Sequence, residues 1–179
     1  MSEEIIIEGI KKGDRGAMRS LYDSLSGYAM ATAMRYTGNR ADAEDVVHDC
    51  FVKVFTHINN YTYRGSGSLK AWVLRIVANE SINHLRKESK FVYTDQMPED
   101  MDSEPPDLSL LPPDMLNKMI SSLPSGYRTV LNLYVFEQKS HKEIARLLGI
   151  KENSSASQYL RAKKLLAHMI NEYKRIHDE

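Results

Sequence analysis

Residues 41–55 read ADAEDVVHDCFVKVF, and their apolar positions recur at alternating spacings of three and four. That spacing is typical of an α-helix with one buried face. The helix is expected to continue through the next apolar position and to bury Ala43, Val46, Val47, Cys50, Phe51, Val54, Phe55 and Ile58. We therefore predict a long helix packed against the core of an all-α domain.

The outer face of this helix is acidic. Its N-terminal half carries Asp42, Glu44, Asp45, His48 and Asp49. The helix macrodipole favours acids in the first turn, but by only about 0.3–1 kcal/mol each. Two interpretations follow: a solvated face that caps the helix well, or a docking surface for a basic partner helix.

A short loop and a basic helix follow. After Tyr61, the run Tyr63-Arg64-Gly65-Ser66-Gly67-Ser68 contains two glycines, which permit positive φ and predict a turn. Ser68 is a candidate cap for a helix that contains Trp72 and Asn79. Aromatic rings beside cations suit single-stranded nucleic acid, because bases stack on rings while cations follow phosphates. The competing interpretation is that Trp72 is an ordinary core residue.

Helix signals also precede the acidic helix. Asp14 is a plausible N-cap, and Gly38 is a plausible stop for a helix over residues 17–36. Its apolar face is expected to comprise Met18, Leu21, Tyr22, Leu25, Tyr28, Ala29, Thr32 and Tyr36. With the two helices that follow, these elements predict one compact helical domain.

Composition narrows the class of protein. No apolar run approaches the roughly 18 residues that a membrane span needs, and the N-terminus lacks a signal-peptide pattern, so we expect a cytoplasmic protein. The single cysteine, Cys50, excludes an internal disulfide, and we interpret it as a core residue. The six histidines show no metal-ligand spacing. We expect neither a metal nor a cofactor.

Charge divides the chain into three parts although the net charge is zero. Residues 61–90 hold six Lys/Arg against two acids, and residues 121–179 hold ten against six. Between them, residues 91–114 hold seven acids, five prolines and no basic residue. We predict two helical domains, 1–90 and 115–179, joined by an acidic, proline-rich linker over 91–114.

The C-terminal part carries a helix-turn-helix pattern. Ser140 and Glu143 have capping-box spacing, Gly149 supplies a turn, and a long helix follows from about Asn153 to Tyr173. The polar and basic residues expected to contact DNA on this second helix are Ser154, Ser155, Ser157, Gln158, Arg161 and Lys164. An ordinary helical hairpin would explain the packing but not this cluster, because serine is a mediocre helix former.

Three segments in order resemble the extracytoplasmic-function sigma factors of bacterial RNA polymerase. They are ADAEDVVHDCFVKVF, YRGSGSLKAWVLRIVANESINHLRK and LPSGYRTVLNLYVFEQKSHKEIARLLGIKENSSASQYLRAKKLL. The resemblance covers nearly the whole chain, and it implies a sigma region 2-like domain, the linker and a region 4-like domain. It also implies an anti-sigma protein as a regulatory partner.

The resemblance also assigns roles to residues. It implies that Asp42, Glu44, Asp45, His48 and Asp49 bind core RNA polymerase. It implies that the melted −10 element is read by Tyr63, Arg64, Gly65, Ser66, Gly67, Ser68, Trp72 and Asn79. It implies that the six residues on the second helix of the helix-turn-helix read duplex −35 DNA, although Ala156 stands where many members carry a basic residue.

The leading hypothesis is therefore a sigma factor that recruits core RNA polymerase to promoter DNA and performs no catalysis. The alternative is a stand-alone helix-turn-helix regulator that binds duplex DNA, usually as a dimer. A nuclease with a metal held by the acids of residues 42–49 is a third possibility. It is disfavoured because those acids lie on one helix face with no second cluster to close a site.

Overall fold

The computed structural model describes residues 2–87, 105–109 and 111–177. These residues form eight α-helices and one short 3₁₀-helix, and they contain no strand. The chain divides into two units, Met1–Glu88 and Ser89–Glu179. The all-α prediction is confirmed, and each unit is described below by itself.

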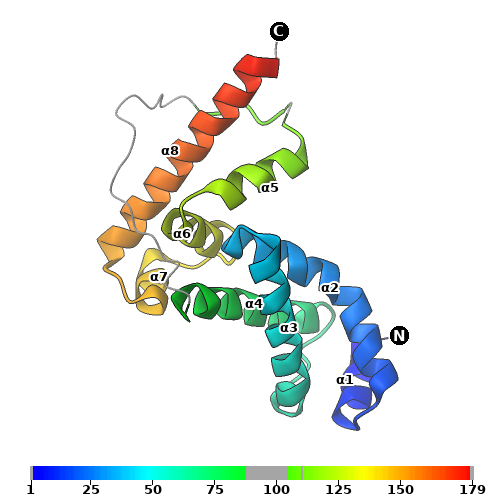
Figure 1. Ribbon diagram of the computed structural model, residues 1–179. Coiled ribbons are helices and arrows are strands. Elements are labelled where there is room, and N and C mark those ends of the chain that lie inside the picture. Colours follow the sequence, from blue (N-terminus) through cyan, green and yellow to red (C-terminus); the bar gives the residue numbers. More distant parts are fainter. Residues whose placement is uncertain (1, 88–104, 110, 178–179) are drawn as a thin grey trace. The chain divides into compact units, whose positions relative to one another are not determined.

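The N-terminal unit contains four α-helices and the 3₁₀-helix (Figure 1). They are α1 (Glu3–Lys11), α2 (Arg15–Thr37), α3 (Arg40–His57), η1 (Ile58–Asn60) and α4 (Ser68–Lys87). The signals predicted to begin and end α2 are present. The Asp14 carboxylate caps α2 by accepting a 2.8 Å hydrogen bond from the Gly16 N–H, and Gly38 ends α2 with φ of 78°.

Three helices of this unit, α2, α3 and α4, pack against one another, and α1 packs on α2 and η1. The apolar face predicted for α3 lies in this core; Phe55 alone among its residues is only half-buried. Burial raises the pKa of the Cys50 thiol to about 12, as expected for a core residue. The prediction for α2 is wrong at Tyr22 and Tyr28, which are 45% and 53% exposed.

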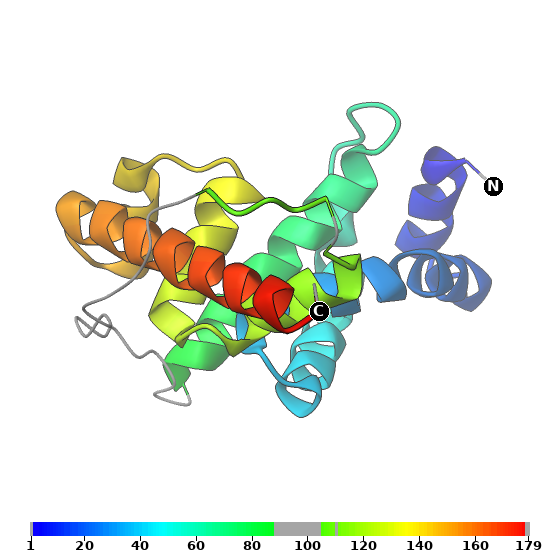
Figure 2. The ribbon, with the colours of Figure 1, turned by 90° about the horizontal axis from the view of Figure 1, so that it is seen from above.

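The C-terminal unit contains α5 (Pro113–Ser122), α6 (Ser125–Val135), α7 (His141–Leu148) and α8 (Glu152–His177). The long helix α8 packs against the other three (Figure 2). Pro113 and Asp114 belong to α5 and not to the linker, because proline is well tolerated in the first turn of a helix. Residues 91–104 of the predicted linker lie outside the described residues.

The core of this unit joins α5, α6 and α8 through Ile120, Leu123, Tyr127, Leu131 and Ala162. Tyr134 and Phe136, at the end of α6 and just after it, are 38% and 47% exposed.

A buried guanidinium ties α6 to the end of α5. Arg128 Nη1 donates to the carbonyl oxygens of Ser121, at 2.7 Å, and Leu123, at 3.0 Å. Burial lowers the Arg128 pKa to about 10, so the group stays charged at neutral pH. In neither unit does a described helix combine the length and the apolar character needed to cross a membrane.

Candidate nucleic-acid and partner interfaces

The acidic face of α3 lies open to solvent at Glu44, Asp45, His48 and Asp49. Glu44 pairs with Arg40 at 2.7 Å, one helical turn away. For Asp45 and Asp49, the described part of the chain supplies no ion pair or hydrogen bond. Two unpaired carboxylates on one exposed face are available to a basic partner.

Asp42 is different from the other acids of this face. Its side chain is only 13% exposed and lies 3.1 Å from Nε2 of His84 at the end of α4. It also accepts a 2.7 Å hydrogen bond from the Asn39 amide. Asp42 therefore joins α3 to α4 within the unit, and its carboxylate is turned away from the open face.

An apolar groove borders the acidic face. Its volume is about 410 Å³, and it is lined by Tyr22, Met30, Glu44, Val47, His48, Phe51, Val52 and Phe55. Tyr22, an exposed tyrosine of α2, therefore lies beside the acidic residues.

In the part of the chain that the structure describes, no three His, Cys, Asp or Glu side chains gather where they could hold a metal ion.

The loop before α4 turns at its two glycines, as predicted: φ is 105° at Gly65 and 82° at Gly67. Ser68 is the first residue of α4, and its hydroxyl bonds residues before the helix and not the backbone of α4. Its hydroxyl lies 2.7 Å from the Tyr61 hydroxyl and accepts a 3.2 Å hydrogen bond from the Arg64 N–H. The Ser68 hydroxyl therefore links the two ends of the loop.

Aromatic and cationic side chains surround this loop. Trp72 packs on Tyr61 with ring centroids 4.7 Å apart, and both rings are half-buried against the core. Arg64 and Asn79 are exposed, and Lys70 sits 3.2 Å above the centre of the Tyr28 ring. The structure therefore packs Trp72 against the core and leaves its side chain partly exposed.

The helix-turn-helix is present in the C-terminal unit. The Ser140 hydroxyl accepts from the Glu143 N–H at 3.2 Å, and the Glu143 carboxylate accepts from the Ser140 N–H at 2.8 Å. The Ser140 N–H and the Ser140 hydroxyl, which donates to the same carboxylate at 2.9 Å, hold the pKa of the Glu143 carboxyl below its usual value. Gly149, with φ of 69°, ends α7 and leads into α8.

Two of the six residues predicted to contact DNA from α8 are buried. Ser155 is 0% exposed and Gln158 4%, and the Ser155 hydroxyl lies 3.0 Å from Nδ1 of His141 on α7. Ser157 and Lys164 are exposed, while Ser154 and Arg161 are half-buried. Sequence periodicity could have revealed the error, since positions 155 and 158 share a helix face with the core residue Ala162.

Sequence reasoning missed an aromatic cluster at the centre of the helix-turn-helix. His141 stacks on Tyr134 with centroids 4.7 Å apart, and Tyr159 of α8 lies 4.3 Å from Tyr134. These rings come from α6, α7 and α8, so no spacing within one helix signals the cluster. Together with the contact between His141 and Ser155, it fixes how α8 sits on α7.

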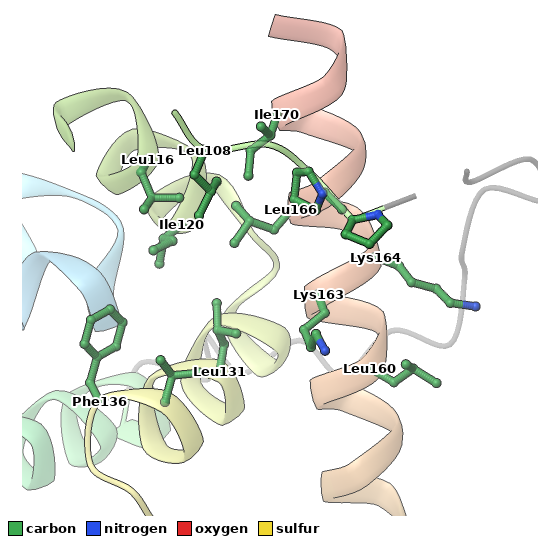
Figure 3. A pocket seen from close by; sticks show the side chains of 14 residues that line it. Leu108, Leu116, Ile120, Leu131, Phe136, Leu160, Lys163, Lys164, Leu166 and Ile170 are labelled. Carbon is green, nitrogen blue, oxygen red and sulfur yellow. The ribbon is translucent and has the colours of Figure 1, made fainter. Parts of the chain in front are cut away.

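A second groove lies in the C-terminal unit, with a volume of about 480 Å³ (Figure 3). Leu116 and Ile120 of α5, Leu131 of α6, and Leu166 and Ile170 of α8 line it (Figure 3). Pro105, Pro106 and Leu108 complete one side, and Lys174 pairs with Asp107 of the same segment at 2.7 Å. Segment 105–109 is therefore attached to α8.

The two units match two known protein families in the order expected. Residues 21–91 match the family Sigma-70 region 2, and residues 114–166 match Sigma-70, region 4. Curated relatives that match the chain carry sigma-factor names. The chain belongs to the extracytoplasmic-function sigma factors of RNA polymerase.

The similarity to individual sigma factors is moderate. The ECF RNA polymerase sigma factor SigE of Mycolicibacterium smegmatis is 29% identical over 86% of this chain, which spans 63% of that relative's length. The RNA polymerase sigma-H factor of Pseudomonas aeruginosa is 23% identical, covering 92% of this chain and 91% of the relative. For SigW of Bacillus subtilis the identity is 24%, with 93% and 95% covered.

Among solved structures, the one titled "Structure of CnrH in complex with the cytosolic domain of CnrY" matches 94% of this chain and 96% of its own. The sequence identity is 21% and the TM-score 0.45.

Proposed function

We propose that this sigma factor directs bacterial core RNA polymerase to a subset of promoters, with the N-terminal unit binding the enzyme and reading unpaired −10 DNA, and the C-terminal unit reading duplex −35 DNA. One observation carries the proposal: an open acidic helix face, an aromatic loop with a basic helix, and a helix-turn-helix occur in one chain. A stand-alone regulator needs only the last of these. The sigma factor itself is not the catalyst of RNA synthesis.

The −10 reader comprises Tyr63, Arg64, Gly65, Ser66, Gly67, Ser68, Trp72 and Asn79. Extruding a base from a duplex costs a few kcal/mol, so a pocket must offer both a ring and groups that bond a base edge. The partly exposed ring of Trp72 and the exposed amide of Asn79 supply these two groups. Exposed Arg64 supplies a cation for the backbone.

The −35 reader is smaller than the sequence suggested. Ser154, Ser157, Arg161 and Lys164 remain, because Ser155 and Gln158 face the interior of the unit. Arg161 can bond a guanine edge with two donors, which contributes about 1–3 kcal/mol of discrimination. Ala156 is also exposed, and it supplies no positive charge to the −35 reader.

The polymerase-binding surface is centred on Asp45 and Asp49, flanked by Glu44 and His48. Asp42 acts within the protein by orienting α3 against α4. An anti-sigma protein that covers this surface stays a prediction based on the family resemblance. Purifying the tagged chain from native cells tests it, since core polymerase and any such inhibitor should be retained together.

The decisive experiment neutralises the two unpaired acids. The double variant Asp45→Asn, Asp49→Asn should bind core polymerase about tenfold more weakly, because exposed carboxylates contribute mainly through complementary charge. A matched control neutralises Asp23 and Glu8, two exposed acids on α2 and α1, and should bind as the wild type does. Equal retention of both double variants on immobilised core enzyme would contradict the proposed surface.

The stand-alone alternative has its own test. A helix-turn-helix regulator would shift palindromic duplex DNA without polymerase, whereas the sigma factor should yield specific transcripts only with core enzyme. Promoter-directed transcription that is unchanged when the protein is omitted would refute the proposed function.

A further inference from the structure

The loop that the proposed function assigns to −10 reading is held from outside by the first turn of α1. The N–H of Gly67 donates to both carboxylate oxygens of Glu3, at 3.1 Å and 3.2 Å. The two residues are 64 positions apart in the chain. Hydrogen bonds to a charged acceptor are stronger than neutral ones.

Glu3 is presented by a well-anchored helix. Ile6, Ile7 and Ile10 of α1 are buried in the core of the N-terminal unit, and α1 packs on η1, which leads into the loop. The Ser2 hydroxyl accepts from the Ile5 N–H and so caps the same turn. The carboxylate therefore occupies a defined position beside the loop.

The loop has little else to fix its conformation. Gly65 and Gly67 both adopt positive φ, and a side chain at either position would meet open space. Within the described residues, the other hydrogen bonds that the structure gives segment 64–67 run to Ser68 and Ala71 of the following helix. Glycines carry the largest backbone entropy, so a contact from a distant helix restricts such a loop substantially.

We propose that Glu3 is a positioning residue for the −10 loop: its carboxylate holds the Gly67 N–H and fixes the loop before the unpaired strand arrives. The inference rests on the proposed function of that loop. A preorganised loop does not need to be ordered when the strand binds, which favours binding. The negative charge acts in the opposite direction, since it repels phosphates.

The neighbouring acid separates these two effects. Glu4 is exposed, lies in the same turn, and has no hydrogen bond or ion pair in the described structure. Replacing either glutamate by alanine removes the same charge from the same turn, but only the change at Glu3 releases Gly67. If repulsion dominated, both variants would read DNA better, whereas positioning predicts a loss confined to Glu3.

The experiment uses the full chain assembled with core polymerase. The probe is a pool of promoter-like DNA whose unpaired −10 strand and duplex upstream element are both randomised, and the retained DNA is sequenced. Glu3→Ala should lower sequence enrichment in the unpaired strand about three- to tenfold, as loss of one exposed hydrogen bond implies. Enrichment in the duplex element and retention of core polymerase should not change.

Two further variants decide the interpretation. Glu3→Gln keeps an oxygen that can accept from Gly67 and should recover most of the enrichment, and Glu4→Ala should match the wild type. Unchanged or increased enrichment in Glu3→Ala would overturn the inference, as would equal losses in Glu3→Ala and Glu4→Ala. If the wild-type complex enriched no sequence in either element, the proposed function itself would fail.

Discussion

Serine occurs at positions 154, 155 and 157 of α8, yet the structure gives these residues different environments. Ser155 is fully buried beside His141, while Ser157 is exposed. A polar residue buried with a partner stabilises the fold, and removal of that partner leaves an unsatisfied group. Chemical type alone therefore does not identify a DNA contact.

These two serines support a paired prediction. Ser155→Ala removes the contact to Nδ1 of His141 and should destabilise the protein by about 1 kcal/mol. That loss corresponds to about 4–8 °C in the melting temperature of a unit of this size. Ser157→Ala should not lower the melting temperature, because alanine is the better helix former, but it should weaken retention of duplex DNA by the complex with core polymerase.

Thermal unfolding and DNA retention, measured on the same two variants, check this assignment. A wild-type melting temperature for Ser155→Ala, or a large drop for Ser157→Ala, would show that the burial assigned to these side chains is wrong.

Asp42 shows why some of the candidate site could not be predicted from sequence. Its spacing places it with the other acids of α3, but its partner is His84 on another helix. Which acid of a face turns inward depends on what packs beside it, and that information is not local. The same reason explains why Glu3 was not singled out.

At the level of helices and turns, most local signals are confirmed, although the Ser68 hydroxyl contacts Tyr61 and Arg64 and does not cap α4. Asp14, Gly38, Gly149 and the Ser140–Glu143 capping box act on neighbouring backbone groups, and each stands where the sequence placed it. The width of a buried helix face depends on the neighbouring helices instead. Tyr22 and Tyr28 have the spacing of core residues on α2, yet they are 45% and 53% exposed.

The turn of the helix-turn-helix gives a test of this kind of local control. Gly149 has φ of 69° with open space where a side chain would lie, so any cost of substitution is conformational. Gly149→Ala should destabilise the protein by about 1 kcal/mol, and Gly149→Asn by less, because asparagine tolerates the left-handed region.

A glycine within a helix should behave in the opposite way. Gly27 lies inside α2, also with open space beside it, and Gly27→Ala should stabilise the protein by about 0.5–1 kcal/mol. Denaturant unfolding of the three glycine variants measures these differences. A stabilised Gly149→Ala variant would contradict the left-handed geometry at that turn.

Over the whole chain, the segregation of charge predicted two helical modules and an acidic segment between them. The structure divides into two compact units, Met1–Glu88 and Ser89–Glu179. The end of the acidic segment contacts the C-terminal unit, because Pro105, Pro106 and Leu108 line its groove and Asp107 pairs with Lys174. Composition reports net acidity but not which acid finds a basic partner.

This attachment predicts a pH-dependent contribution to stability. The Lys174 ammonium and the Ser109 N–H hold the pKa of the Asp107 carboxyl well below its usual value. A group whose pKa is lowered by folding stabilises the folded state above its ordinary pKa, and that contribution is lost as the pH falls through the folded-state value. Asp107→Asn should therefore lower the melting temperature of the C-terminal unit at neutral pH, and the difference from wild type should shrink in acid.

Asp114→Asn removes the same charge a few residues away, from the first turn of α5, and serves as the control. A difference between Asp107→Asn and wild type that stayed constant from neutral to strongly acidic pH would mean that the ion pair with Lys174 does not hold segment 105–109 on α8.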